Sequence, residues 1–423
     1  MPFRFIHAAD LHLDSPLRSL ALRDPALAEL IGNATRRAFT TIVDLCLDEQ
    51  VDALLLSGDL YDGEQTSMKT ARFLGDQVRR LHEAGIRTFI IRGNHDALSR
   101  ITKELTFPDS VLVFGGRPAV VEPPRPRGAV PVAIHGISLA QPQAPDSLLG
   151  RFRPPVADTV NIGLLHTSLG GAEGHDPYAP CDMAELQRAG FRYWALGHVH
   201  RRSATEGTAT VVMPGMPQGR DIGEAGAKSV TLATVGDDGA IAIEERHTSI
   251  AQFERVPVEL DGVEDWRGLL AALEAALGAA RDRTVSEHLV ARLQLRGTTP
   301  LAWQLRRDGD LLRAEAEQLA QGSRHTWIDR VEVAVQPPPS VPRPAAGAVA
   351  DPLEELRRLM DEVAGDEGFR AESAAIAEEL RAQLPPECRA MLGPDAQGFA
   401  AGLDGAARDG IDAVLARLRA GQD

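Results

Sequence analysis

Five short polar clusters in the first 200 residues carry side chains that could hold metal ions. Hydrolysis of phosphoesters by two divalent ions needs carboxylates, amide oxygens and imidazoles around one shared centre. A mixed oxygen and nitrogen set suits manganese, iron or zinc better than calcium, which prefers oxygen ligands alone. The clusters are Asp10-Leu11-His12, Gly58-Asp59-Leu60-Tyr61-Asp62-Gly63, Gly93-Asn94-His95-Asp96, Gly163-Leu164-Leu165-His166 and Gly197-His198-Val199-His200.

The spacing within the clusters fits a shared site. In an Asp-x-His or His-x-His pair on an extended segment, alternate side chains lie on one face and can reach one centre. Gly58 and Gly93, directly before Asp59 and Asn94, allow the backbone to turn sharply. Any one cluster alone also fits an ordinary surface turn. Because all five follow apolar runs, the set as a whole favours a metal-dependent hydrolase.

The elements that must position these side chains can be read from hydrophobic periodicity. Amphipathic stretches at 26–50 and 66–84 predict helices between the first three apolar runs. Such alternation predicts an α/β sheet with its site at the carboxyl ends of the strands. The runs that lead into the clusters span 3–10, 52–59, 87–94, 161–168 and 193–200. Further strands, expected to form a second sheet, span 131–139, 208–215, 229–235 and 240–247.

The remaining two fifths of the chain, from residue 251 onward, differ in pattern from the first 250 residues. Residues 251–335 predict a small α+β domain, with strands at 253–259, 288–295 and 326–335 and helices at 264–281 and 301–320. Residues 336–352 are a Pro/Ala linker, too rich in proline for a helix. Residues 353–423 predict an acidic helical tail. The expected domains are therefore 1–250, 251–335 and 353–423, with the linker before the last.

The order of the five motifs resembles the calcineurin-like metallophosphoesterase superfamily. The longer segments HAADLHLDSPL (7–17), FRYWALGHVHRR (191–202) and PGMPQGRDIGEAG (214–226) are similar to its DNA-repair exonuclease branch, above all to SbcD and YhaO-like nuclease subunits. The resemblance implies an α/β (α+β) fold, with a four-layer β-sandwich flanked by helices. It also implies that 251–335 is a capping domain that positions DNA.

The resemblance implies a role for each motif residue. Asp10, His12 and His200 would hold one divalent ion, and Asn94, His166 and His198 the other, with Asp59 bridging the two. His95 matches the catalytic histidine, which assists the leaving oxygen. Asp62 would orient His95, or else it is a loop carboxylate. A hydroxide between two ions, most simply Mn²⁺, would attack the phosphorus in line.

The substrate and partners follow from the same resemblance. Arg201, Arg202 and Arg220 could contact DNA phosphates, and His175 could line the substrate channel. All are equally consistent with ordinary surface residues. A coiled-coil ATPase (SbcC/YhaN-like) is the implied partner, on which the acidic tail could dock; a solvated appendage is the alternative. A homodimer is a further option.

Charge and composition set limits on these expectations. The net charge is −15, and about half of the acidic excess lies in residues 351–423. An acidic chain argues mildly against nucleic-acid binding, unless the tail is a separate module. No apolar run approaches 18 residues, and the N-terminus lacks a signal pattern. The three cysteines form no disulfide or zinc spacing, which favours a cytoplasmic protein without a membrane segment.

Three functions remain open at this point. The first is a dinuclear metal-dependent DNA exonuclease of the double-strand-break repair type. The second is a phosphodiesterase or phosphatase that acts on nucleotides or small phosphoesters. The third is a scaffold that keeps the fold without catalysis. A scaffold would be expected to lack ligands, whereas all seven metal positions and His95 are present.

Overall fold

The computed structural model describes two compact units. The first unit comprises Met1–Arg255, Ala280–Ala291 and His325–Asp329, and the second unit comprises Val256–Ala279, Arg292–Arg324 and Arg330–Asp423. The described residues are 1–15, 25–61, 67–96, 106–139, 141, 144, 146–170, 178–338, 352–384, 389, 392–393 and 395–419.

The first unit contains two six-stranded sheets. The order in one sheet is β12-β11-β1-β2-β3-β4, from β1 (Phe3–Ala8), β2 (Ala53–Ser57), β3 (Arg87–Ile91), β4 (Val111–Val113), β11 (Ser229–Val235) and β12 (Ile241–His247). The order in the other is β5-β6-β7-β8-β10-β9, from β5 (Ala119–Val121), β6 (Val132–Gly136), β7 (Val160–His166), β8 (Tyr193–Gly197), β9 (Ser203–Thr205) and β10 (Thr210–Met213).

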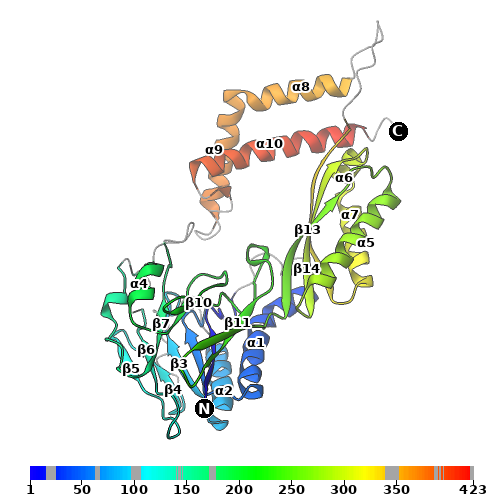
Figure 1. The fold of residues 1–423 in the computed structure, drawn as a ribbon. Coiled ribbons are helices and arrows are strands. Elements are labelled where there is room, and N and C mark those ends of the chain that lie inside the picture. Colours follow the sequence, from blue (N-terminus) through cyan, green and yellow to red (C-terminus); the bar gives the residue numbers. More distant parts are fainter. Residues whose placement is uncertain are drawn as a thin grey trace. The chain divides into compact units, whose positions relative to one another are not determined.

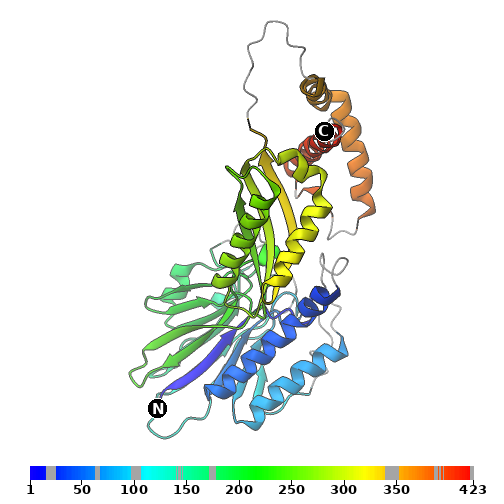
Figure 2. The same cartoon turned by 90° about the vertical axis from the view of Figure 1, so that its right-hand side faces the viewer.

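These sheets pack face to face because their strands are apolar on both sides. Phe5 and Phe89 of the first sheet share a buried cluster with Leu164 and Tyr193 of the second. The outer face of the first sheet is covered by α1 (Pro25–Asp48) and α2 (Met68–Glu83), which lie side by side (Figures 1 and 2). The short α4 (Met183–Arg188) packs outside the second sheet, against Trp194. The predicted four-layer sandwich flanked by helices is confirmed.

Two of the predicted strands belong to a different sheet from the one expected. Residues 229–235 and 240–247 form β11 and β12, which were expected in the second sheet. Instead, β11 pairs antiparallel with β1, from Phe3↔Val235 to His7↔Thr231, and β12 pairs with β11. A strand's apolar pattern predicts that it is buried but not which strand it pairs with, so this assignment was wrong.

The second unit holds most of the predicted α+β region. The sheet order is β13-β14-β15, and the expected helix at 301–320 is broken at Asp308, where φ is −102° and ψ is 36°. The strands are β13 (Ala251–Glu259), β14 (His288–Thr298) and β15 (Thr326–Gln336), whose first residues belong to the first unit; the helices are α5 (Trp266–Arg283), α6 (Ala302–Arg307) and α7 (Gly309–Gly322).

The acidic tail packs on this same unit. It forms α8 (Pro352–Gly365), α9 (Glu367–Gln383) and α10 (Ala396–Arg419). Ile411 and Leu415 of α10 share a small core with Leu353 of α8 and Trp303 of α6. Asp412 forms ion pairs with arginines of α6 and α8. Within the described part of the chain, no helix combines the length and apolar character needed to cross a membrane.

Candidate metal centre

The polar motifs converge at one edge of the two sheets. The loops after β1, β2 and β3 and the ends of β7 and β8 meet there, as the carboxyl ends of parallel strands do in α/β proteins. Two groups of metal-capable side chains result, and within each group the ligand atoms lie within 4.8 Å of one another. We call the seven residues at this edge the central cluster: Asp10, His12 and His200 in one group, Asp59, His166 and His198 in the other, and Asn94 beside His166.

Asp59 lies between the two groups. Its Oδ2 is 3.4 Å from Nε2 of His166 and 4.0 Å from Nε2 of His12. Within the groups, Nε2 of His12 and Nε2 of His200 are 3.1 Å apart, and Oδ1 of Asn94 is 3.0 Å from Nε2 of His166. One carboxylate therefore faces an imidazole of each group, as a bridging ligand must.

The backbone is strained where it carries these side chains. Four of the seven residues of the central cluster have positive φ: Asp10 (54°), His12 (41°), Asp59 (53°) and His198 (109°). Side chains rarely tolerate this region, which costs on the order of 1–3 kcal/mol per residue and is typical of functional sites. Local strain of this kind is maintained only where the surrounding structure holds it.

Two glycines make room for the cluster. A methyl group on Gly93 would lie 2.1 Å from Oδ1 of Asp59, and one on Gly58 would lie 2.5 Å from Nδ1 of His166. Any larger residue at either position would displace a member of the central cluster. Both glycines are thus required by the close approach of side chains, and Gly58 also by its positive φ of 96°.

Burial disfavours the charged form of Asp10, His12, Asp59 and His166. It raises the pKa of Asp10 to about 6 and lowers that of His12 to about 3. Burial would also raise the pKa of Asp59, but the neighbouring His166 holds it below its usual range. For His166, Asp59 outweighs burial and raises the pKa to about 9. Such mutual perturbation is typical of functional sites.

The donor set fits divalent cations. Buried carboxylates need a positive partner, and the members of this cluster are acids, an amide and imidazoles. Nε2 of His12 and Nε2 of His200 can share only one proton across 3.1 Å, whereas both lone pairs can serve a cation. Two carboxylates, one amide oxygen and four imidazoles match the ligand preferences of manganese, iron and zinc.

His95 and Asp96 have separate places beside the cluster. The ring of His95 is partly exposed and its centroid lies 5.0 Å from that of His12, while its backbone amide donates to Oδ1 of Asp59 at 3.1 Å. The buried Asp96 accepts hydrogen bonds from the backbone amides of Leu60, Tyr61 and Gly93. Asp96 therefore ties two motif loops together. Asp62 lies outside the described residues.

The candidate DNA contacts differ in how available they are. Arg201 is exposed. Arg202 donates to Oγ1 of Thr231 and pairs with Glu245. Arg220 is engaged by Glu224, through contacts of 2.6–3.2 Å. Of the three arginines, two are thus held by carboxylates of the protein. His175 lies outside the described residues.

Glu224 is a member of the site that sequence reasoning did not single out. Its Oε1 is 3.0 Å from Nδ1 of His200. Burial would raise its pKa, but hydrogen bonds from His200 and Arg220 hold it well below its usual range, so the carboxylate is ionised. The only available signal was its place in the segment PGMPQGRDIGEAG.

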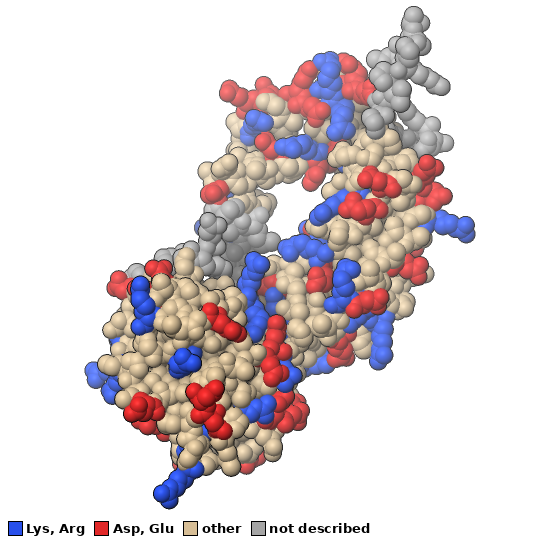
Figure 3. All heavy atoms as spheres, in the orientation of Figure 1, with Lys and Arg blue, Asp and Glu red and all other residues tan. Residues whose placement is uncertain are grey.

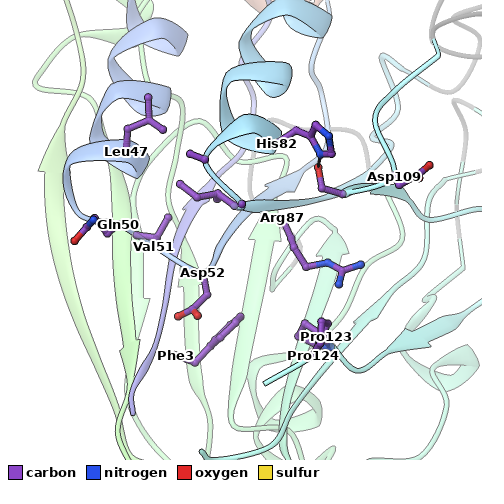
Figure 4. Close-up of a pocket in the computed structure, with 14 residues that line it drawn as sticks. Phe3, Leu47, Gln50, Val51, Asp52, His82, Arg87, Asp109, Pro123 and Pro124 are labelled. Atoms are coloured by element: carbon purple, nitrogen blue, oxygen red, sulfur yellow. Dashed lines mark hydrogen bonds between the residues drawn. The ribbon is translucent and has the colours of Figure 1, made fainter. Parts of the chain in front are cut away.

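A separate cavity of about 580 Å³ lies at the opposite ends of the strands. Its lining includes Phe3, Asp52 and Arg87, at or just before the starts of β1, β2 and β3 (Figure 4). His82 on its wall contacts Oγ of Ser110, and Asp52 is held by Arg125. None of the described motif residues lines this cavity, so it is not part of the candidate site.

Comparison with known proteins gives two family matches. The model described as calcineurin-like phosphoesterase matches residues 3–202, and the model described as metallophosphoesterase YhaO, middle domain, matches residues 253–336.

Three curated relatives are informative. The uncharacterized metallophosphoesterase YhaO of Bacillus subtilis is 33% identical over 334 residues, which cover 78% of this chain and 81% of that protein. The DNA double-strand break repair protein Mre11 of Sulfurisphaera tokodaii is 28% identical, over 47% of this chain and 49% of that protein. The SbcD component of the nuclease SbcCD of Bacillus subtilis is 27% identical, over 54% of this chain and 65% of that protein. The match to Mre11 thus spans about half of that relative.

Proposed function

Because the chain belongs to the calcineurin-like metallophosphoesterases, in the family of YhaO, we propose that it is a dinuclear metal-dependent exonuclease acting on DNA. Hydrolysis of phosphoesters is the chemistry of this superfamily. The DNA substrate, the exonucleolytic mode of cleavage and the identity of the metal go beyond this and are proposed here.

The observation that carries the proposal is the position of Asp59 between the two histidine groups. We assign Asp10, His12 and His200 to one ion, Asn94, His166 and His198 to the other, and Asp59 to both. When bound, two divalent ions lower the pKa of water and neutralise charge on the phosphate. Manganese suits the mixed donors.

His95 is assigned as the catalytic histidine. Its backbone amide is tied to Asp59 and its ring is partly exposed beside His12. An imidazole in that place can donate a hydrogen bond to a phosphate oxygen and protonate the departing sugar oxygen. Asp62 is proposed to orient it. Asp96 acts only by holding the loops that carry Asp59 and Asn94.

A DNA substrate is supported by the printed names of the relatives, a repair protein and a nuclease component. We propose that residues 251–335 form a cap that steers duplex ends toward the catalytic domain of residues 1–250. Basic and acidic side chains are intermingled on the face drawn in Figure 3. Of the three candidate arginines, Arg202 and Arg220 are held by carboxylates and Arg201 is exposed. We therefore propose that DNA is held by few arginine contacts and by the cations, so that binding depends only modestly on salt.

A partner is supported by the tail. Helices α8, α9 and α10 expose apolar side chains. Exposed apolar surface favours a docking surface for another protein over a solvated appendage. We propose that this surface binds the helices of a coiled-coil ATPase, as the resemblance to SbcD implies. The exposed apolar residues are Leu359, Val363, Phe369, Ile376, Leu380, Val414 and Leu418.

The experiment is a substrate panel with the purified chain and Mn²⁺. We expect linear duplex DNA to be degraded, covalently closed circular duplex to be spared, and Asp59→Asn to be inactive on both. Hydrolysis of mononucleotides or p-nitrophenyl phosphodiesters without any action on linear DNA would favour a small-substrate enzyme. No hydrolysis of any substrate, together with no bound Mn²⁺, would favour the scaffold.

A further inference from the structure

The loop of residues 214–224, which follows β10, lies against both the backbone and the ring of His200. Gly215 has φ +73°, and a methyl group there would lie 2.8 Å from the carbonyl oxygen of His200. Further along, the buried side chain of Gln218 accepts from the amide of Ile250 at 2.7 Å and donates to the carbonyl of Ala251 at 2.8 Å. The loop is therefore fixed both to the backbone of His200 and to the start of β13.

The loop ends by placing a carboxylate behind His200. Glu224 ends a short 3-10 turn (Ile222–Glu224), in which the amide of Gly223 donates to the side chain of Asp221. Its side chain is only 13% exposed. It receives a hydrogen bond from Nδ1 of His200 at 3.0 Å, from the guanidinium of Arg220 at 2.6 Å and from the backbone amide of Arg220 at 2.8 Å.

The ring orientation of His200 determines which nitrogen can bind a cation. Nδ1 lies 3.0 Å from Oε1 of Glu224, and a carboxylate in this place accepts a hydrogen bond from Nδ1–H. Nε2 is the nitrogen that faces His12 in the central cluster. A carboxylate behind an imidazole also fixes the ring orientation and makes the ligand nitrogen more basic.

We propose that Arg220 and Glu224 form a positioning pair that presents Nε2 of His200 to the cation on the Asp10–His12–His200 side of the centre. The proposal rests on the dinuclear function proposed above. It also reassigns Arg220, a candidate DNA contact by sequence: its guanidinium holds the Glu224 carboxylate in place.

The two sides of the centre differ in this respect. Nδ1 of His166 bonds to the backbone carbonyl of Ser57 at 2.9 Å, a neutral group that no side-chain substitution removes. His200 instead depends on a side chain. Loss of Glu224 should therefore weaken one of two cations and leave the other largely unaffected, which a general loss of folding would not do.

The test measures binding of Mn²⁺ itself, by calorimetric titration and by counting bound ions by electron paramagnetic resonance. Glu224→Gln keeps the size of the side chain, and Glu224→Ala removes it. Glu49→Gln is the matched control, since Glu49 is held by Arg4 and Arg246 but contacts no histidine of the cluster. Thermal unfolding without metal checks that each variant folds.

We expect wild type and Glu49→Gln to bind two Mn²⁺ per chain with the same affinities. Both Glu224 variants should keep one site and lose 10–100-fold in affinity at the other, about the effect of removing a carboxylate behind a ligand histidine. Arg220→Ala should shift the same site in the same direction, by less.

Wild-type affinities at both sites in the Glu224 variants would overturn the proposal. Equal weakening of both sites, or failure of both Glu224 variants to fold, would also overturn it, because either result indicates a general structural role. A wild-type chain that binds no pair of ions would instead contradict the proposed function.

Discussion

Among its described residues, the first unit holds two clusters of histidines and carboxylates with similarly short distances between ligand atoms but different hydrogen bonding. The second, which we call the outer cluster, consists of Glu287, His288 and His325 at the starts of β14 and β15. Its ligand atoms also lie within 4.8 Å of one another. In the central cluster Asp10 and His166 are at most 1% exposed, whereas the side chains of Glu287 and His325 are 47% and 41% exposed.

Hydrogen-bond direction separates the two clusters. In the outer cluster the indole of Trp327 donates to Nδ1 of His288 at 3.3 Å. The proton of His288 therefore lies on Nε2, which faces Glu287 at 3.4 Å. Arg37 pairs with the other oxygen of Glu287 at 2.9 Å. Both ring nitrogens of His288 and both oxygens of Glu287 thus have partners without a cation.

The central cluster has the opposite arrangement. Nε2 of His12 and Nε2 of His200 face each other. Glu224 bonds to Nδ1 of His200, so that Nε2 of His200 points into the cluster. Backbone strain does not distinguish the clusters, because His325 also has a positive φ of 53°. Proximity of ligand-type residues is therefore insufficient, and the orientation of donors decides which cluster suits a metal.

The largest expected effect comes from the bridging position. Asp59→Ala should abolish Mn²⁺ binding and lower nuclease activity by more than about 10³-fold, since losing one electrostatic contact to a transition state already costs about 10²–10³-fold. The matched change Glu287→Ala should leave both ions and the rate unchanged. Bound metal is measured by mass spectrometry of the desalted protein, and loss of metal in both variants would erase the distinction between the clusters.

His95→Ala separates ligands from catalytic groups within the central region. It should retain both Mn²⁺ ions and lower the rate by about 10²–10⁴-fold, the usual contribution of a proton-transferring side chain. The readouts are Mn²⁺ content and the rate on linear duplex DNA. Metal loss equal to that of Asp59→Ala would contradict the role assigned to His95.

His7 shows the effect of burial on a histidine that is not assigned as a metal ligand. It is fully buried, as His12 and His166 nearly are, but it contacts the hydroxyl of Tyr193 and the carbonyl of Leu196. Burial lowers its pKa to about 3, against about 6.5 when unfolded. As pH falls, the unfolded chain therefore binds the proton before the folded chain does. The contribution of neutral His7 to the free energy of unfolding is complete above pH 6.5 and is lost as pH falls from 6.5 toward 3.

For one such histidine, the free energy of unfolding falls by about 1.4 kcal/mol between pH 7.5 and pH 5.5. His7→Gln should therefore flatten the pH dependence of the free energy of unfolding by about this amount. Urea denaturation at the two pH values measures it. An unchanged pH dependence would show that His7 has the same pKa in the folded and unfolded chain, which would contradict the effect assigned to its burial.

The smallest effect is expected in the outer cluster. His288→Ala should lower the free energy of unfolding by about 1 kcal/mol through loss of the Trp327 hydrogen bond, with Mn²⁺ stoichiometry unchanged. Urea denaturation and metal analysis provide the two readouts. A drop in bound Mn²⁺ would mean that the outer cluster is a third metal site.

Much of the fold could be predicted from the sequence because its signals are local. The amphipathic periods at 26–50 and 66–84 agree closely with α1 and α2, and Gly58, Gly93 and Gly197 lie at or just after strand ends. The partner of β11, the break at Asp308 and the packing of α10 on α6 depend on tertiary contacts that a linear pattern does not contain.

The candidate site divides in the same way. The motif residues could be identified because each follows an apolar strand, and the structure brings Asp10, Asp59 and His166 to one edge. Glu224 could not be given a role, because its 24-residue separation from His200 is bridged only by the folded 214–224 loop. The outer cluster was equally invisible, since His288 and His325 begin strands that become neighbours only in the sheet.

The most direct measurement is the anomalous scattering of Mn²⁺ in crystals of the wild-type chain. We expect two peaks, one among Asp10, His12 and His200 and one among Asn94, His166 and His198, with Asp59 reaching both, and no peak near His288 and His325. Peaks at the outer cluster instead, or a single ion at the centre that Asp59 does not touch, would contradict the distinction on which the function rests.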